Sequence, residues 1–198
     1  MMKGAREQPS AFAGTVDALS RLFRDCGVAV PESDLREADV GPQRRVVEGW
    51  LERVLQHSCA ATRDACSALA QIAPLLCWRQ NASYRDAALL AGYGYCELAG
   101  PHGHLIDTRK SLGVLLLAPR THYPQHRHPA NEIYVVLAGS AEWRVDDEPW
   151  RRRDPGAAIR HRSMAIHAMR TDESPLLAAY LWTDHLDTPA TLVREERS

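Results

Sequence analysis

This sequence lacks the features that mark several classes of protein. It has five cysteines, an odd number without a CxxC pair, so we predict neither a disulfide scaffold nor a zinc knuckle. A dominant charge is also missing, since 24 Lys and Arg stand against 25 Asp and Glu, for a formal net charge of -1. Binding to nucleic acid takes most of its affinity from neutralising phosphates, and we therefore expect no nucleic-acid partner.

Long apolar segments are missing as well. No apolar run is long enough to span a bilayer, and Met1 to Ser10 is polar, without the apolar core of a signal peptide. We therefore expect a cytoplasmic protein with no membrane partner. In a reducing compartment the cysteines are predicted to be small buried apolar residues, namely Cys26, Cys59, Cys66, Cys77 and Cys96.

The first half of the chain has the pattern of helices. The chain has 198 residues, of which 45% are hydrophobic, enough for one domain with a core and a helical extension. Residues 46–55 and 58–73 are predicted helices, and Gly27 is placed where the first helix would end. The apolar face of that first helix repeats at three or four residues: Phe12, Val16, Leu19 and Phe23.

The second half has the pattern of short strands. Residues 113–118, 133–137 and 176–182 are apolar runs, and residues 140–145 alternate between apolar and polar. Short strands separated by turns predict an antiparallel sandwich or barrel. We therefore expect a mainly β protein. Residues 1–92 are predicted to form an α-helical N-terminal extension packed on the barrel, and residues 93–198 to form the barrel with a metal site.

One cluster of polar residues carries recognisable chemistry. His126 and His128 are two residues apart, so their side chains share one face of an extended strand. Pro129 to Asn131 breaks that strand, and Glu132 and Tyr134 again share a face. If the two pieces fold together, two imidazoles, a carboxylate and a phenol converge. This donor set suits one divalent transition metal, with Zn²⁺, Fe²⁺, Mn²⁺, Co²⁺ and Ni²⁺ all open.

A site of this kind needs one more protein ligand, and two histidines compete for the role. His167 has apolar neighbours and follows the predicted turn at Pro155 and Gly156 at a distance that lets a neighbouring strand carry it inward. His161 stands between two arginines, so we expect it to be exposed. The sequence therefore favours His167.

These residues resemble the first motif of the cupin superfamily, a double-stranded β-barrel that holds a metal at its centre. The matching pattern is His126-x-His128-x3-Glu132-x6-Gly139. The resemblance is looser elsewhere, because Arg120 stands in place of the usual first glycine and the second motif is only partly kept. It implies a cupin barrel as the fold of the second half.

A narrower resemblance accounts for these departures. Residues 121–134, 167–171 and 177–182, with Trp78 to Gln80 upstream, are similar to the cupin-type dimethylsulfoniopropionate (DMSP) lyases. The similarity extends over about residues 75–185. It implies a metal-dependent carbon–sulfur lyase that cleaves DMSP to dimethyl sulfide and acrylate by β-elimination.

The resemblance also implies roles for individual residues. His128, Glu132 and His167 would hold the metal. Tyr134 would be a metal-proximal ligand or the base, and Tyr123 the alternative base. A phenol has a pKa of about 10, and a nearby divalent cation favours its anion and lowers that pKa. His126 and Tyr123 would line the substrate pocket.

The sulfonium group of DMSP is a poorly hydrated cation that favours aromatic faces. Four residues are predicted to offer such faces: Tyr123, Trp143, Trp182 and Trp78. Asn131 stands where these lyases often have another carboxylate, which leaves other substrates open. The alternatives are a cupin metalloenzyme acting on another small carboxylate, by elimination, isomerisation or oxygenation, and a cupin that only binds a small molecule. A monomer and a homodimer both fit.

Overall fold

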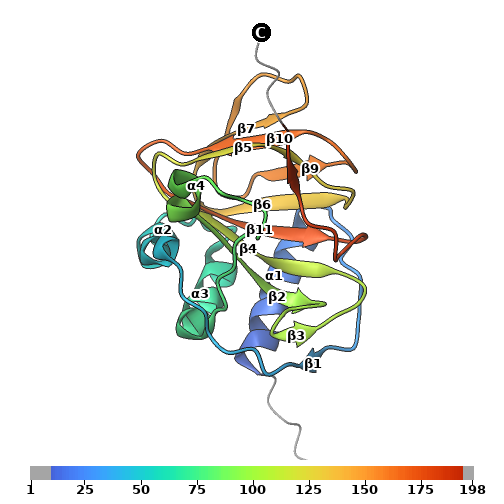
Figure 1. Cartoon of the computed structure of the whole chain (residues 1–198). Coiled ribbons are helices and arrows are strands. Elements are labelled where there is room, and N and C mark those ends of the chain that lie inside the picture. The colour runs from blue at the N-terminus through green and yellow to red at the C-terminus, as the bar shows by residue number, and fades with distance from the viewer. Residues whose placement is uncertain (1–9, 194–198) are drawn as a thin grey trace, which may run out of the picture.

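The fold has three layers, seen in the computed structural model of the chain (Figure 1). Helices cover the outer face of a large sheet, and a smaller sheet packs on the inner face of the large one. The structure describes residues 10–193. Residues 1–9, which make up most of the segment used to predict the absence of a signal peptide, and residues 194–198 lie outside this description.

Twelve strands form the two sheets within the described residues. The larger sheet has the order β1 (Arg36–Glu37), β3 (Leu105–Ile106), β2 (Tyr93–Gly100), β4 (Ser111–Leu117), β11 (Leu176–Trp182), β6 (Glu132–Gly139) and β9 (Ala158–His161). The smaller sheet has the order β12 (Thr191–Leu192), β5 (His122–Arg127), β10 (His167–Arg170), β7 (Ala141–Val145) and β8 (Arg151–Arg153). All neighbouring strands are antiparallel except β2 and β3.

The helices all lie before β2 in the described chain. They are α1 (Ala11–Asp25), η1 (Val46–Trp50), α2 (Leu51–Leu55), α3 (Arg63–Ile72), η2 (Ala73–Leu75) and α4 (Ala87–Gly92), η denoting a 3₁₀ turn. The first helix ends as predicted, with Gly27 at a φ of 71° just beyond it. The second predicted helix begins as a 3₁₀ turn, and the third begins at Arg63 rather than at residue 58. The division of the chain between residues 92 and 93 stays a prediction. One strand of the first part, β1, joins the larger sheet by pairing with β3.

Both faces of the larger sheet are buried, which explains why its strands are continuous apolar runs. In β11, Leu177, Ala179 and Leu181 pack with the helices, whereas Leu176, Ala178 and Tyr180 point between the sheets. The helical side is almost entirely aliphatic and the inner side is rich in aromatic residues. The expected mainly β architecture with a helical N-terminal part is confirmed, in the form of two facing sheets.

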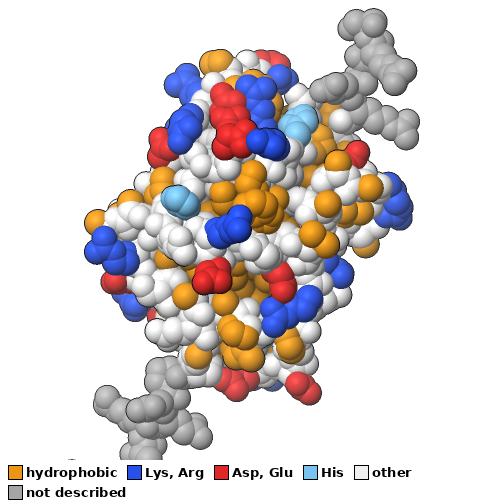
Figure 2. All heavy atoms as spheres, turned by 90° about the vertical axis from the view of Figure 1, so that its left-hand side faces the viewer, with side chains coloured by type: hydrophobic (Ala, Val, Ile, Leu, Met, Phe, Trp, Pro, Cys, Tyr) orange, Lys and Arg blue, Asp and Glu red, His pale blue; other side chains and the backbone are white. Residues whose placement is uncertain are grey.

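The surface carries charges of both signs. Figure 2 shows Lys and Arg interspersed with Asp and Glu over one face of the molecule. Within residues 10–193 no helix is long and apolar enough to cross a bilayer. All five cysteines are free thiols, but only Cys66, Cys77 and Cys96 are buried. The prediction of buried cysteines is therefore wrong for Cys26 and Cys59, which are partly exposed.

Gly139 ends β6 in a conformation that only glycine adopts easily. Its φ is 69°, and a Cβ atom built on it would lie 1.9 Å from the carbonyl oxygen of Pro175. We expect Gly139→Ala to lower the free energy of unfolding by about 2–4 kcal/mol in urea titrations. The matched control is Gly14→Ala at an exposed position of α1, where a Cβ atom meets nothing within 4 Å. This control should raise the free energy of unfolding by roughly 0.5–1 kcal/mol. A similar effect of both variants would contradict this reasoning.

Candidate active site

The polar side chains of the site are brought together by strand register. In the larger sheet, Glu132 of β6 pairs with Trp182 of β11 on one side and with His161 of β9 on the other. In the smaller sheet, His167 of β10 pairs with His126 of β5. Inward-facing residues in one row of paired strands are close neighbours, so each sheet supplies one row of the site.

Glu132 is the centre of the cluster. Its Oε2 atom lies 3.2 Å from Nε2 of His128, 3.0 Å from Nδ1 of His161 and 3.4 Å from Nε2 of His167. One ligand atom each from His128, Glu132 and His167 can be chosen so that all lie within 4.8 Å of one another. These three residues and His161 are all buried. Two imidazole nitrogens and a carboxylate oxygen this close form a donor set compatible with a divalent transition metal.

Backbone contacts fix the tautomers of the two histidines that could ligate a metal, His128 and His167. Nδ1 of His128 lies 3.1 Å from the carbonyl oxygen of Ala130, and Nδ1 of His167 lies 2.9 Å from that of Ala165. A carbonyl oxygen only accepts hydrogen bonds, so both Nδ1 atoms carry the proton and both Nε2 atoms present a lone pair. Nε2 of His167 is also buried without a hydrogen-bond partner among the described residues. A bound metal would satisfy this atom, so the residues fit a metal.

His161 belongs to the same cluster, and the prediction that it is exposed is wrong. The residue is only 2% exposed, because residues alternate along β9, with Arg160 facing outward and His161 inward. Nδ1 of His161 contacts Glu132, and its Nε2 has no hydrogen-bond partner in the described chain. The period-two pattern of β9 was the signal that could have revealed this histidine.

The charges of the cluster suit metal binding. Burial raises the pKa of Glu132, but the close contacts of its carboxylate with the imidazoles of His128, His161 and His167 outweigh burial and hold this pKa well below its usual range. Burial and the neighbouring His167 lower the pKa of His161 to about 4, and the same two causes hold the pKa of His126 well below its usual range. The carboxylate is therefore ionised and these two imidazoles are neutral at pH 7.

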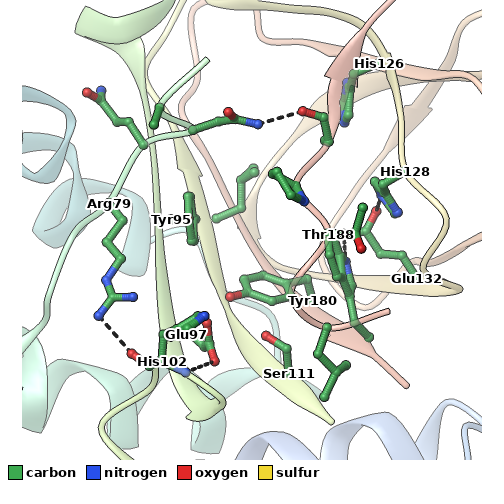
Figure 3. Close-up of a pocket in the computed structure, with 18 of the residues that line it drawn as sticks. Arg79, Tyr95, Glu97, His102, Ser111, His126, His128, Glu132, Tyr180 and Thr188 are labelled. Atoms are coloured by element: carbon green, nitrogen blue, oxygen red, sulfur yellow. Dashed lines mark hydrogen bonds and ion pairs between the residues drawn. The ribbon is translucent and has the colours of Figure 1, made fainter. Parts of the chain in front are cut away.

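The cavity beside this cluster has a volume of about 480 Å³, within the usual range for small-molecule sites. Figure 3 shows His128 and Glu132 at one end and Arg79, Glu97 and His102 at the other. Five of the six tyrosines of the chain line it: Tyr93, Tyr95, Tyr123, Tyr134 and Tyr180. The cavity therefore joins an end that could hold a metal to a space lined with aromatic residues.

The two tyrosines predicted as bases, Tyr123 and Tyr134, both line this cavity but have different neighbours. The hydroxyl of Tyr123 lies 2.9 Å from that of Tyr84, and its ring stacks on His126 with centroids 4.0 Å apart. Tyr134 lies two residues from Glu132 on β6, and its ring centroid is 5.6 Å from that of His161. Burial and the charge of Glu132 raise the pKa of Tyr134 well above 10 when no metal is bound. Its role as base or metal ligand stays a prediction.

The three predicted tryptophans lie in different places. Trp182 lines the cavity, donates its indole N–H to Oε1 of Glu132 at 2.6 Å and stacks on His128 at 4.3 Å. Trp143 and Trp78 are buried away from the cavity lining, Trp143 between the sheets and Trp78 on the helical side. The structure therefore does not bring Trp143 or Trp78 to the substrate space.

Asn131 is likewise turned away from the cavity lining. Its side-chain N–H donates to Oδ2 of Asp184 at 2.6 Å, and its side-chain Oδ1 accepts from the backbone N–H of Ser163 at 3.1 Å. Asn131 therefore ties together three loops beside the site.

Trp182 is expected to strengthen metal binding by holding Glu132 in place through its indole N–H. We expect Trp182→Phe, which removes the N–H donor but keeps a ring against His128, to weaken metal affinity by about 10–100-fold. Competition with a metallochromic chelator measures this change. The control is Trp150→Phe, since Trp150 lies beside His122 and Arg170 and does not line the cavity. An unchanged affinity in Trp182→Phe would contradict a role for the indole in holding Glu132.

Sequence reasoning missed several residues of the cavity. Arg79, Tyr95, Glu97 and Tyr180 line it but were not predicted as site residues. Tyr180 pairs with Tyr134 in the register of β11 and β6. Arg79 lies in a segment that resembles the DMSP lyases, but the spacing within that segment does not place it in the cavity. Only the pairing of distant strands brings the four residues together.

Comparisons with known proteins agree with this geometry. The sequence model of the dimethylsulfoniopropionate lyase family matches residues 21–178. A relative, dimethylsulfoniopropionate lyase DddQ of Ruegeria pomeroyi, is 36% identical over 177 residues, which cover 85% of each chain.

Solved structures agree as well. The crystal structure of DMSP lyase DddQ from Ruegeria pomeroyi superposes with a TM-score of 0.83 at 28% identity, covering 93% of this chain and 97% of that one. A chain from the crystal structures of the DMSP lyases RdDddP and RnDddQII gives the same TM-score and identity, covering 93% and 98% of the two chains.

Proposed function

This chain belongs to the dimethylsulfoniopropionate lyase family and is a carbon–sulfur lyase, and on that premise we propose how its own residues cleave DMSP. The observation that carries the proposal is the cluster of His128, Glu132 and His167 at one end of a cavity that Tyr134 also lines. We assign the three cluster residues as metal ligands. A divalent cation held there would supply Lewis acidity and withdraw charge from the substrate carboxylate.

Tyr134 is the general base of the proposed reaction. Its phenolate removes the proton from the carbon next to the carboxylate, the electron pair of that C–H bond forms the double bond of acrylate, and the C–S bond breaks to release dimethyl sulfide. Its position two residues from Glu132 supports this role, because a cation beside Glu132 opposes the raised pKa of the phenol.

Tyr123 is less suited to act as the base. Burial and the tyrosines Tyr93 and Tyr84 raise its pKa well above 10, and its hydroxyl is bound to that of Tyr84. We assign Tyr123, His126 and Trp182 to the wall that positions the substrate and excludes water. Trp182 also orients Glu132 through its indole N–H.

The test is release of dimethyl sulfide from DMSP, measured by gas chromatography. The protein is stripped of metal and reloaded separately with Zn²⁺, Fe²⁺, Mn²⁺, Co²⁺ and Ni²⁺. We expect release only from reloaded protein. No release from protein shown to contain metal would overturn DMSP as the substrate, and other small carboxylates would then be assayed. The oligomeric state, monomer or homodimer, stays a prediction.

A further inference from the structure

The cavity has a second polar end, opposite the metal ligands. We define this distal end by Tyr95, Glu97 and Tyr180, all of which line the cavity. In Figure 3, Tyr180 lies between Glu132 on one side and Tyr95 and Glu97 on the other. A ligand that extends from the metal cluster into the cavity therefore meets the ring of Tyr180 before it approaches Glu97.

Strand register explains this arrangement. Glu97 of β2 pairs with Gly113 of β4, Gly113 with Tyr180 of β11, and Tyr180 with Tyr134 of β6. A Cβ atom on Gly113 would lie 2.6 Å from the hydroxyl oxygen of Tyr180. The missing side chain at Gly113 thus leaves room for the Tyr180 ring to lie across β4 towards Glu97. One row of the sheet leads from the tyrosine near the metal cluster to a carboxylate.

Glu97 is a buried carboxylate that no side-chain cation pairs directly, and burial raises its pKa. Among the described residues it forms no ion pair within 4.0 Å, and its Oε1 atom accepts one hydrogen bond, from the backbone N–H of His102 at 3.0 Å. Arg79, the nearby cation, donates instead to the carbonyl oxygen of His102 at 2.8 Å. Glu97 is buried, so the field of its carboxylate is weakly screened inside the cavity.

We propose that the distal end of Tyr95, Glu97 and Tyr180 binds the cationic end of the substrate. The inference rests on the proposed function, in which the metal end holds the carboxylate. The faces of the two phenol rings attract a poorly hydrated cation, and Glu97 adds a negative charge behind them. Tyr180 lies between Glu132 and Glu97, so its ring is the part of the distal end that the cation meets first. Glu97, on β2 three strands from β6, acts on the cation through its field and is a specificity-determining residue.

Glu97 also has a structural role that a test must separate from this one. Its Oε1 atom packs against Gly100, where a Cβ atom would lie 1.9 Å away, and it anchors the turn at residues 100–103. Glu97→Gln keeps an oxygen that accepts the His102 N–H bond but loses the charge. The substitution therefore removes the electrostatic role and preserves the anchor.

The test compares two ligands of the same shape by isothermal titration calorimetry on the metal-loaded protein. They are 3-(trimethylammonio)propionate and 4,4-dimethylpentanoate, which share the carboxylate and differ only in a cationic nitrogen or a neutral carbon. We expect the wild type to bind the cationic ligand about tenfold more tightly. In Glu97→Gln the ratio of the two affinities should fall to near one, and Tyr180→Leu should also lower it.

The matched control is Glu173→Gln, which removes an exposed carboxylate that does not line the cavity and should leave the ratio unchanged. A wild type without preference for the cationic ligand, or an unchanged ratio in Glu97→Gln, would overturn the proposal. A variant that binds both ligands more weakly in equal measure would assign Glu97 to the turn alone and would overturn it too. Because these titrations need no turnover, their outcome is independent of whether DMSP is cleaved.

Discussion

Tyr134→Phe is expected to lower kcat for release of dimethyl sulfide by about 10²–10⁴-fold, the usual contribution of a positioned general base. The substitution removes one oxygen and keeps the ring, whose centroid lies 5.8 Å from that of Trp143 and 6.4 Å from that of Tyr180. Metal content, measured by inductively coupled plasma mass spectrometry, should stay close to that of the wild type, because His128, Glu132 and His167 remain.

Tyr123→Phe is the matched control for this prediction. It also removes one hydroxyl from the cavity wall, but that hydroxyl is bound to Tyr84 rather than placed beside the metal ligands. We expect its effect on kcat to be at least tenfold smaller than that of Tyr134→Phe. A severe loss in Tyr123→Phe with a mild one in Tyr134→Phe would exchange the two roles and make Tyr123 the base.

Glu132→Gln is expected to abolish both metal binding and turnover. Glu132 is the one carboxylate of the cluster, its Oε2 lies within 3.4 Å of a nitrogen of His128, His161 and His167, and its Oε1 accepts the N–H of Trp182. An amide of the same shape carries no charge and cannot accept at both atoms. Metal content of the purified variant should approach zero, and dimethyl sulfide release should fall to background.

The variants His167→Ala and His161→Ala separate a ligand from a residue that orients it. Removing His167 should eliminate the metal, whereas removing His161 should only weaken metal binding, by about 10–100-fold. Both imidazoles contact the same oxygen of Glu132, so their effects on local packing are comparable. Retention of metal in His167→Ala with its loss in His161→Ala would reverse the assignment.

Much of the fold was predictable because its signals are local. The runs that predicted strands at residues 113–118, 133–137 and 176–182 fall on β4, β6 and β11, and Gly27 follows α1. Hydrophobic periodicity depends only on neighbouring residues and the geometry of one element. The start of the third helix was predicted five residues too early, because an alanine-rich segment carries no sharp N-terminal signal and Thr62 provides no side-chain cap.

The sequence by itself placed Glu132 and Tyr134 on one face of a strand, because spacing along a strand fixes which side chains share a face. Its resemblance to the DMSP lyases implied the donor set His128, Glu132 and His167. The tertiary structure alone decided that His161 joins Glu132, that Trp182 orients it while Trp143 and Trp78 lie elsewhere, and that Glu97 and Tyr180 reach the same cavity. The physical reason is strand pairing. Which strands become neighbours, and in which register, depends on burying both faces of the larger sheet, a requirement of the whole chain rather than of any one segment.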